Sequence, residues 1–273
     1  MGWVTFVYLG ASVFYLLKMI RQSLLWGRIA GLTAVSGFVL QSLAMIHRWA
    51  ESYRLGIGHA PLANFYESLV FFAWAIALLC IVIEWRLKSR NIGVFAFPMA
   101  FLLLAYASFS PGVDSRIQPL IPALQSNWLI SHVVTCFLGY AAFAVAFGFG
   151  ILYLMKDKKG KDVPGRFLGS LPDPETLDEW IYQSVFFGFV IFSVGIITGS
   201  VWAQYAWGSY WSWDPKETWS LITWLVYAAL LHSRFVREWR GRRMAFMAIA
   251  GFAAVLFTYL GVNYLAGLHS YIK

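Results

Sequence analysis

Charged side chains are scarce in this chain: Asp, Glu, Lys and Arg make up only 12% of its 273 residues. A water-soluble domain normally carries about a quarter charged residues. This sequence cannot cover a large water-facing surface, which excludes a soluble globular protein. Hydrophobic residues reach 60%, the mean hydropathy is +0.64, and the apolar residues fall in long blocks. That pattern is typical of a protein with several transmembrane helices.

Acidic residues are scarcer than basic ones, 13 against 21, which leaves a formal net charge of +8. Excess positive charge indicates nucleic-acid binding when it gathers on one soluble face. Here the basic residues lie between apolar blocks, so we predict no nucleic-acid partner. The first apolar block is followed by Arg21 and Arg28 rather than by a small-residue cleavage site, so no cleavable signal peptide is expected.

Cysteine is nearly absent: the chain has only Cys80 and Cys136. The two residues form no CxxC motif and no metal-binding spacing, which argues against a zinc site or a disulfide framework. Both lie inside apolar blocks. We predict that they are small buried side chains.

Eight apolar blocks account for most of the sequence, and a membrane-spanning helix needs about 20 mostly apolar residues. We therefore predict an all-α, polytopic membrane protein with about eight transmembrane helices in a single membrane domain, residues 1–273. The first block is the weakest, because Lys18 closes it early, and the fifth is long enough to tilt or protrude. The blocks are Trp3–Leu17, Ile29–Ile46, Phe65–Ile83, Ile92–Phe109, Trp128–Met155, Ile181–Trp202, Thr218–Leu231 and Met244–Leu265.

The basic residues are distributed unevenly between the two sets of connecting segments. Sixteen of the 21 Lys and Arg fall in alternate segments, which the positive-inside rule assigns to the cytoplasm. Both termini are then predicted on the outer (periplasmic) side. In the longest cytoplasmic segment, Asp173-Pro174-Glu175 is expected to cap a short surface helix.

The third outer segment, residues 203–217, contains an unusual aromatic loop. Its end has a structural explanation: Asp214 can cap a helix, Pro215 fits the first helical position, and Glu217 completes a capping box. The aromatic residues need another explanation, because interfacial tryptophans are usually spread over many helix ends. They could form a broad flat platform for a planar macrocycle or pack as belt residues, and residue chemistry leaves both open. These residues are Trp207, Tyr210, Trp211, Trp213 and Trp219.

Two of the five histidines lie at the depth of this loop. His132 is about 6 Å below the outer start of the fifth helix, and His269 follows the eighth helix on the same side. Two imidazoles facing each other across a flat pocket would form a bis-histidine haem site. His47 and His59 lie on the same side, so the sequence does not fix this pairing.

His232 is different, because it lies about 20 Å along the seventh helix, in its cytoplasmic half. An ionisable residue inside a membrane span is a candidate functional residue, although a hydrogen bond to a neighbouring helix would also explain it. No other histidine of this chain reaches that depth on the inner side. A second ligand at His232 would therefore have to come from another chain.

The aromatic loop, Trp-Gly-Ser-Tyr-Trp-Ser-Trp-Asp-Pro-Lys-Glu-Thr-Trp at 207–219, resembles the tryptophan-rich WWD motif of haem-handling proteins. Its Asp-Pro-Lys-Glu-Thr ending is similar to the CcsA (ResC) branch, the System II cytochrome c biogenesis proteins. Three further segments resemble that family: Pro61-Leu62-Ala63-Asn64-Phe65-Tyr66-Glu67-Ser68, Ser126-Asn127-Trp128 leading to His132, and Gly261-Val262-Asn263-Tyr264 leading to His269. The resemblance extends over nearly the whole chain from the second helix onward.

The resemblance implies a cofactor-binding site for haem b at the outer face, formed by the WWD loop (203–217) and the outer loops 47–64 and 110–127. It implies that His132 and His269 are the axial ligands of the outer haem iron. It also implies that His232 ligates haem within the membrane, with a second ligand from a CcsB/ResB-type membrane subunit. The implied contacts from the loop are Trp207, Gly208, Tyr210, Trp211, Trp213 and Asp214.

The family resemblance also implies a function of the holocytochrome c synthase (haem lyase) type, exercised as part of a complex. Haem would move to the outer WWD site for thioether attachment to the CxxCH segment of apocytochrome c. The main alternative is a transporter that delivers haem without catalysing ligation, and a structural subunit without a cofactor is a third. The expected location is the bacterial inner (cytoplasmic) membrane, or the thylakoid membrane if the sequence comes from a chloroplast.

Overall fold

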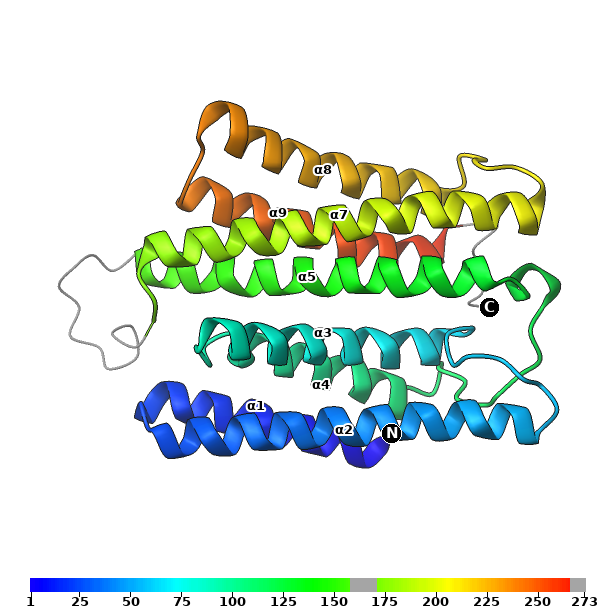
Figure 1. Cartoon of the computed structure of the whole chain (residues 1–273), viewed down its shortest axis with the longest axis horizontal. Coiled ribbons are helices and arrows are strands. Elements are labelled where there is room, and N and C mark those ends of the chain that lie inside the picture. The colour runs from blue at the N-terminus through cyan, green and yellow to red at the C-terminus, as the bar shows by residue number, and fades with distance from the viewer. Residues whose placement is uncertain (158–170, 266–273) are drawn as a thin grey trace.

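The computed structural model describes residues 1–157 and 171–265, and within this part the chain is all-helical (Figure 1). All eight predicted apolar blocks form α-helices, most of them longer than the blocks themselves. A 3-10 helix, η1, covers Pro122–Leu124, and another, η2, covers Gly261–Tyr264. The α-helices are α1 (Gly2–Arg21), α2 (Leu24–Arg54), α3 (Phe65–Leu87), α4 (Gly93–Phe109), α5 (Asn127–Asp157), α7 (Pro174–Trp207), α8 (Pro215–Arg237) and α9 (Arg242–Tyr259).

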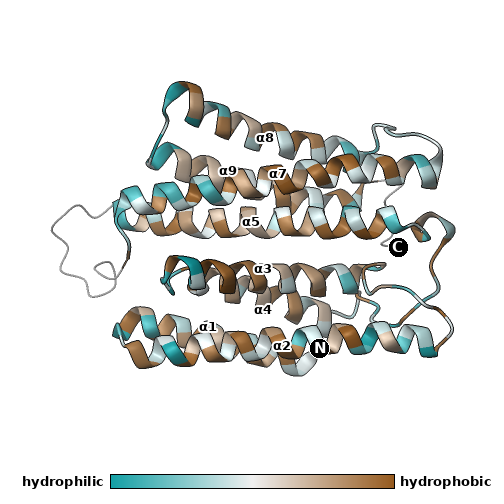
Figure 2. Ribbon diagram, in the orientation of Figure 1, coloured by the Kyte–Doolittle hydropathy of each residue, from teal (hydrophilic) through white to brown (hydrophobic). Residues whose placement is uncertain are grey.

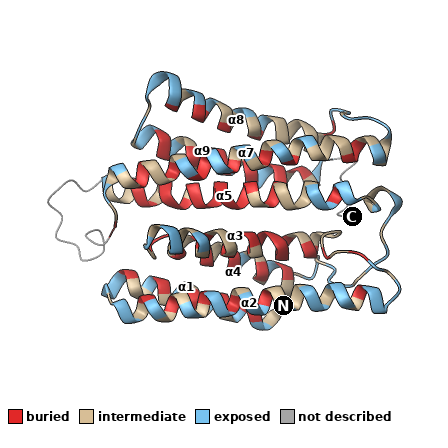
Figure 3. Ribbon diagram, viewed as in Figure 1, coloured by how far each residue is buried: buried red, intermediate tan, exposed pale blue. Residues whose placement is uncertain are grey.

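The helices alternate in direction and form two groups, α1–α4 and α5 with α7, α8 and α9 (Figure 1). Helix α5 is the centre of the bundle: it packs most extensively against α7 and also contacts α3 and α9. Its middle is buried on nearly every side, whereas the outward faces of α1 and α2 expose many apolar side chains (Figures 2 and 3). Apolar surface of this extent suits a lipid environment.

Six of these helices are long and apolar enough to cross a membrane. The exceptions are α4, which has only 17 residues, and α8, which is less apolar than the others. The structure therefore supports a polytopic membrane protein of eight helices with six clear candidate spans. The fifth helix has 31 residues, as its long block predicted.

The prediction of a short surface helix at Asp173-Pro174-Glu175 is wrong. Asp173 instead precedes the first residue of α7, a single 34-residue helix that continues to Trp207. The cause is packing: Leu177 and Ile181 in the first turns are fully buried, so this polar-looking start joins the core. The sequence correctly predicted that a helix starts here. It did not predict the length of this helix, which depends on packing against other helices.

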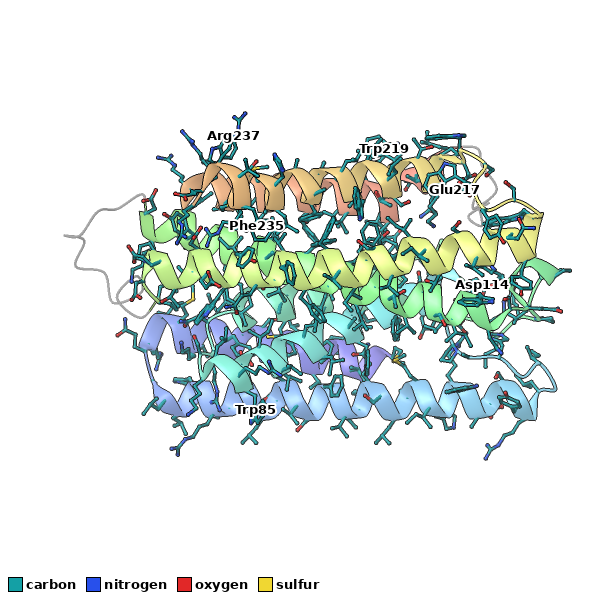
Figure 4. The ribbon with its side chains drawn as sticks, turned by 45° about the horizontal axis from the view of Figure 1, so that its top comes forward. Trp85, Asp114, Glu217, Trp219, Phe235 and Arg237 are labelled. Carbon is teal, nitrogen blue, oxygen red and sulfur yellow. The ribbon has the colours of Figure 1, made fainter. Side chains whose placement is uncertain are left out.

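The connecting segments separate into two sets at opposite ends of the bundle (Figure 1). Segments 55–64, 110–126 and 208–214 lie at one end, here called the loop end, and segments 22–23, 88–92 and 238–241 lie at the other. Figure 4 shows Asp114, Glu217 and Trp219 toward the loop end and Arg237 toward the opposite end. This grouping matches the two sides that the basic residues distinguished.

Candidate functional site at the loop end

A cavity of about 190 Å³ lies at the loop end, between α3, α5, α7 and α8. Its walls are mostly apolar and aromatic, with a few polar groups among them. Such a composition is typical of sites for small organic ligands and cofactors. Its lining includes His132, Cys136, Trp202, Trp211, Lys216 and Asn263.

His132 projects from the second turn of α5 into this cavity. Its Nδ1 atom lies 2.8 Å from the carbonyl oxygen of Gly195 on α7. The ring also stacks on the indole of Trp202, with 5.8 Å between ring centroids and 18° between planes. The imidazole is therefore held in one orientation by the neighbouring helix.

Trp202 was not predicted as a site residue, although it ended the sixth apolar block. It is buried, and its indole Nε1 donates a hydrogen bond to the carbonyl oxygen of Ala123 in loop 110–126 at 2.8 Å. Its position five residues before Trp207, the first residue of the aromatic loop, was the available signal, but only tertiary packing places it on His132.

The WWD loop is shorter than the predicted 203–217, because α7 continues to Trp207 and α8 begins at Pro215. The predicted outer loop 47–64 is likewise shortened, because α2 continues to Arg54. Gly208 has φ 75° and closes the helix in the left-handed conformation that favours glycine. Trp207 packs edge-on against Trp202, with 4.8 Å between ring centroids and 64° between planes. Tyr210 lines the cavity, although its side chain is largely exposed.

The tryptophans of the loop do not share one plane. Trp211 and Trp213 meet at 86°, and Trp219 packs instead on Phe257 of α9. Trp213 is 68% exposed and has φ 59°, which is uncommon outside glycine. Of the four loop tryptophans, Trp211 lines the cavity.

The indole Nε1 of Trp211 is buried, and it has no hydrogen-bond partner within residues 1–157 and 171–265. A buried N–H without an acceptor costs roughly 1–3 kcal/mol. Its position in a cavity wall makes it a natural donor to a polar ligand group. Lys216 in the same wall contributes a second cavity-lining group with hydrogen-bond donors.

The end of the loop forms the predicted capping box. The backbone N–H of Lys216 donates to Asp214 Oδ1 at 2.9 Å. The Glu217 carboxylate accepts from the N–H groups of Asp214 and Ser212, at 3.2 and 2.7 Å, and from the Ser212 hydroxyl at 3.1 Å. Glu217 therefore fixes the last turn of the loop relative to α8.

The Pro61–Ser68 motif forms the opposite rim, and its contacts explain its residues. Asn64 caps α3 by accepting a hydrogen bond from the N–H of Glu67. The buried Glu67 carboxylate pairs with Arg48 at 2.7 Å and accepts from the N–H of Ala63 at 2.8 Å. Ser68 Oγ lies 2.9 Å from the Tyr259 hydroxyl, which joins this rim to α9.

His47 and His59, the other outer-side histidines that the structure describes, lie outside the cavity wall. His59 is buried, with its two ring nitrogens 2.8 and 3.0 Å from the carbonyl oxygens of Ala60 and Gln118, so it joins two outer loops. His47 is exposed on α2. Neither lines the cavity, which separates them from His132 among the histidines that the structure describes.

His269 lies outside the described residues, as does the rest of the chain after Leu265. The last segment before it, η2, brings Asn263 into the cavity wall. The pairing of His132 with His269 therefore stays a prediction. Both cysteines are buried and free, as expected, but Cys136 also lines the cavity, where its Sγ lies 3.6 Å from His132 Nδ1.

His232 is exposed on the outer face of α8, away from this cavity. The exposed side chains on the same face are apolar. In the described part of the chain, no group of three or more His, Cys, Asp and Glu side chains is placed to hold a metal ion. The neighbouring residues on that face are Ile222, Leu225, Ala229 and Val236. An imidazole on such a face is accessible to a second subunit.

The fold and the cavity define a multi-pass α-helical membrane protein with an aromatic, histidine-containing site at one end of its bundle. Residues 62–269 match the family described as "Cytochrome C assembly protein". The chain belongs to this family and, within it, to the cytochrome c biogenesis proteins named CcsA.

The curated relatives support this assignment over most of the chain. The "Cytochrome c biogenesis protein CcsA" of Guillardia theta is 41% identical and covers 82% of this chain and 79% of the relative. That of Prochlorococcus marinus (strain MIT 9303) is 38% identical over 96% and 92%. That of Pyropia yezoensis is 38% identical over 89% and 87%.

A solved structure shares the fold at lower sequence similarity. The "Cytochrome c Heme Lyase CcmF" superposes with a TM-score of 0.63 at 18% identity. The match covers 94% of this chain but only 45% of that one, so this chain spans less than half of its length. The likeness establishes a common architecture.

Proposed function

We propose that this protein takes up haem b, moves it to the loop-end cavity and presents it for covalent attachment to apocytochrome c. The observation that carries this proposal is the cavity itself, where an oriented imidazole, a buried indole N–H and a lysine lie among aromatic walls. Membership in the cytochrome c biogenesis proteins supports the same assignment.

The residues in the cavity fit haem. Apolar and aromatic side chains suit the faces of a macrocycle, and the His132 imidazole suits its iron. The Trp211 N–H and the Lys216 ammonium are donors that suit the propionate carboxylates. His269 is the proposed second axial ligand, while the loop residues Trp207, Gly208, Tyr210, Trp213 and Asp214 shape the rim.

The size of the cavity bears on how haem would be presented. Its volume of about 190 Å³ is below the roughly 300–1,000 Å³ of pockets that enclose a drug-sized ligand. We therefore expect one edge of the macrocycle to remain outside the walls. An exposed edge would leave the vinyl groups accessible to the substrate thiols.

The chemistry supplied by haem is the addition of each cysteine thiol of CxxCH across a vinyl double bond. Sulfur bonds to one vinyl carbon and the thiol hydrogen ends on the other, so the step needs no oxidant. The protein's contribution is positional: His132 holds the ring through its iron, and the WWD loop fixes its orientation. The protein would thereby hold haem close to the cysteine thiols, which would otherwise meet it only by diffusion.

His232 has a separate role in this proposal. An exposed imidazole in an apolar, lipid-facing stripe is costly unless it has a partner. A ligand from a CcsB/ResB-type subunit, packed on this face of α8, would complete a haem site within the membrane. The expected location is the bacterial inner membrane or the thylakoid membrane, with both termini on the outer side.

The test uses the protein purified in detergent together with its CcsB/ResB-type subunit. We expect a sharp low-spin haem band in the reduced state, which weakens in His132→Ala and returns when imidazole is added. Covalent cytochrome c should be lost in cells that carry His132→Ala at normal protein levels. His47→Ala, at an exposed histidine toward the same end that does not line the cavity, is the control and should retain both signals.

A haem transporter that performs no ligation is the second candidate function. The same cavity would serve it, because the WWD loop indicates haem handling without specifying thioether formation. The two functions differ in reconstituted complexes supplied with haem and apocytochrome. Covalent product supports ligation, whereas bound haem that is never attached supports transport alone.

A further inference from the structure

Gly199 of α7 faces His132 across the α5–α7 interface, and Gly195, one turn earlier, faces Cys136 while its carbonyl oxygen contacts His132. A Cβ atom placed on Gly199 would lie 2.5 Å from His132 Nδ1 and 2.6 Å from its Cε1. Carbon atoms do not approach ring atoms this closely, so the ring occupies space that only glycine leaves open. One turn earlier, a Cβ on Gly195 would lie 2.7 Å from the Sγ of Cys136.

The carbonyl of Gly195 also determines which ring nitrogen carries the proton. A carbonyl oxygen can only accept, so at 2.8 Å His132 Nδ1 must be the donor. In the neutral imidazole, the lone pair then lies on Nε2. Histidine ligands in metal sites commonly have this arrangement, in which the other nitrogen donates to a backbone carbonyl.

We propose that Gly195 and Gly199 are positioning residues for His132, which prepare its Nε2 to bind haem iron. Gly199 provides the space that lets the ring lie against α7 beside Trp202, and the Gly195 carbonyl fixes the tautomer. This inference rests on the proposed function, because it assumes that His132 is an axial ligand. It adds that the geometry of the ligand is determined by α7 rather than by α5, the helix that carries it.

The same interface offers a matched control for packing alone. A Cβ on Gly188 would lie 2.7 Å from Cε1 of Phe143, a ring on α5. This resembles the clash at Gly199, but it occurs eleven residues earlier, about 16 Å along α7. Gly188→Ala should therefore disturb helix packing to a similar degree without touching His132.

The experiment compares Gly199→Ala with Gly188→Ala in the purified complex. We expect the reduced low-spin haem band to fall at least about fivefold in Gly199→Ala and to return with added imidazole. Gly188→Ala should retain the band, even if its melting temperature falls. Equal behaviour of the two variants, or a loss in Gly199→Ala that imidazole does not restore, would overturn the inference.

A double-mutant cycle gives a readout that does not depend on haem. In the haem-free protein, Gly199→Ala should lower the melting temperature when His132 is present. It should have little further effect in the His132→Ala background, because the ring it collides with is gone. Equal destabilisation in both backgrounds would show that Gly199 acts through general packing.

His132→Ala separates failure of this inference from failure of the proposed function. If His132→Ala keeps the full low-spin band, His132 is not the ligand and both proposals fail. If His132→Ala loses the band but Gly199→Ala keeps it, only the positioning role fails.

Discussion

The indole of Trp202 stacks on the imidazole of His132, with 5.8 Å between centroids and 18° between planes. The same indole donates a hydrogen bond to the Ala123 carbonyl. Trp202 therefore joins three elements at the cavity: the proposed ligand on α5, its own helix α7, and loop 110–126. The WWD loop begins just after this contact, where Trp207 packs edge-on against the same ring.

The first prediction concerns Trp202 itself. Trp202→Phe should retain the stack on His132 but lose the hydrogen bond to Ala123, at a cost of about 0.5–1.5 kcal/mol. Trp202→Leu should lose both and should weaken the haem band further. Thermal unfolding and haem titration of both variants measure the loss of stability and of haem affinity. Equal haem affinity of Trp202→Phe and Trp202→Leu would contradict a role for the stack.

The second prediction concerns the buried indole N–H of Trp211. Leaving this donor unpaired costs roughly 1–3 kcal/mol in the absence of a ligand. Trp211→Phe should therefore leave the haem-free protein as stable as before, or more stable, while it weakens haem binding. Thermal unfolding and haem titration measure the two effects separately. Weaker stability together with unchanged haem affinity would rule out a donor role toward haem.

The third prediction concerns the capping box that ends the WWD loop. Glu217→Ala should remove three hydrogen bonds to Ser212 and Asp214 and destabilise the start of α8 by about 1–2 kcal/mol. The loop should become more accessible, which limited proteolysis would show as faster cleavage near residue 212. Thr218→Ala is the control, because its hydroxyl donates only one hydrogen bond, to the Trp213 carbonyl at 3.2 Å.

The fourth prediction concerns His232. Because its side chain is exposed on α8, His232→Ala should leave the melting temperature of the isolated chain nearly unchanged. In the complex with a CcsB/ResB-type subunit it should remove part of the haem spectrum, while the signal that depends on His132 remains. Ala229→Leu on the same face would test whether that subunit packs there. A full spectrum in His232→Ala would exclude a ligand role.

Much of the fold of this protein could be predicted from local sequence. The low charge and the eight apolar blocks predicted a helical membrane protein, because each block is long enough to satisfy its backbone hydrogen bonds within one helix. The capping box at Asp214 and Glu217 was also readable, since a cap needs only residues within one turn. The burial of Cys80 and Cys136 followed from the blocks that contain them.

Other features depended on elements distant in the sequence. The start of α7 at Pro174 looked like a surface helix, and only its packing made it part of a long buried one. Residue chemistry left open whether the four loop tryptophans form one platform. In the structure Trp207 packs on Trp202 of its own helix α7, and Trp219 packs on Phe257 of α9. Spacing along the chain carries no information about such neighbours.

The sequence by itself determined the class of fold, the helix boundaries that caps define, and the two sets of loops that the basic residues distinguish. The tertiary structure decided which polar groups share a cavity and how they are oriented. His132 and Gly195 are 63 residues apart, and nothing local in either segment predicts their hydrogen bond. Only the close packing of α5 on α7, which small residues permit, brings them together.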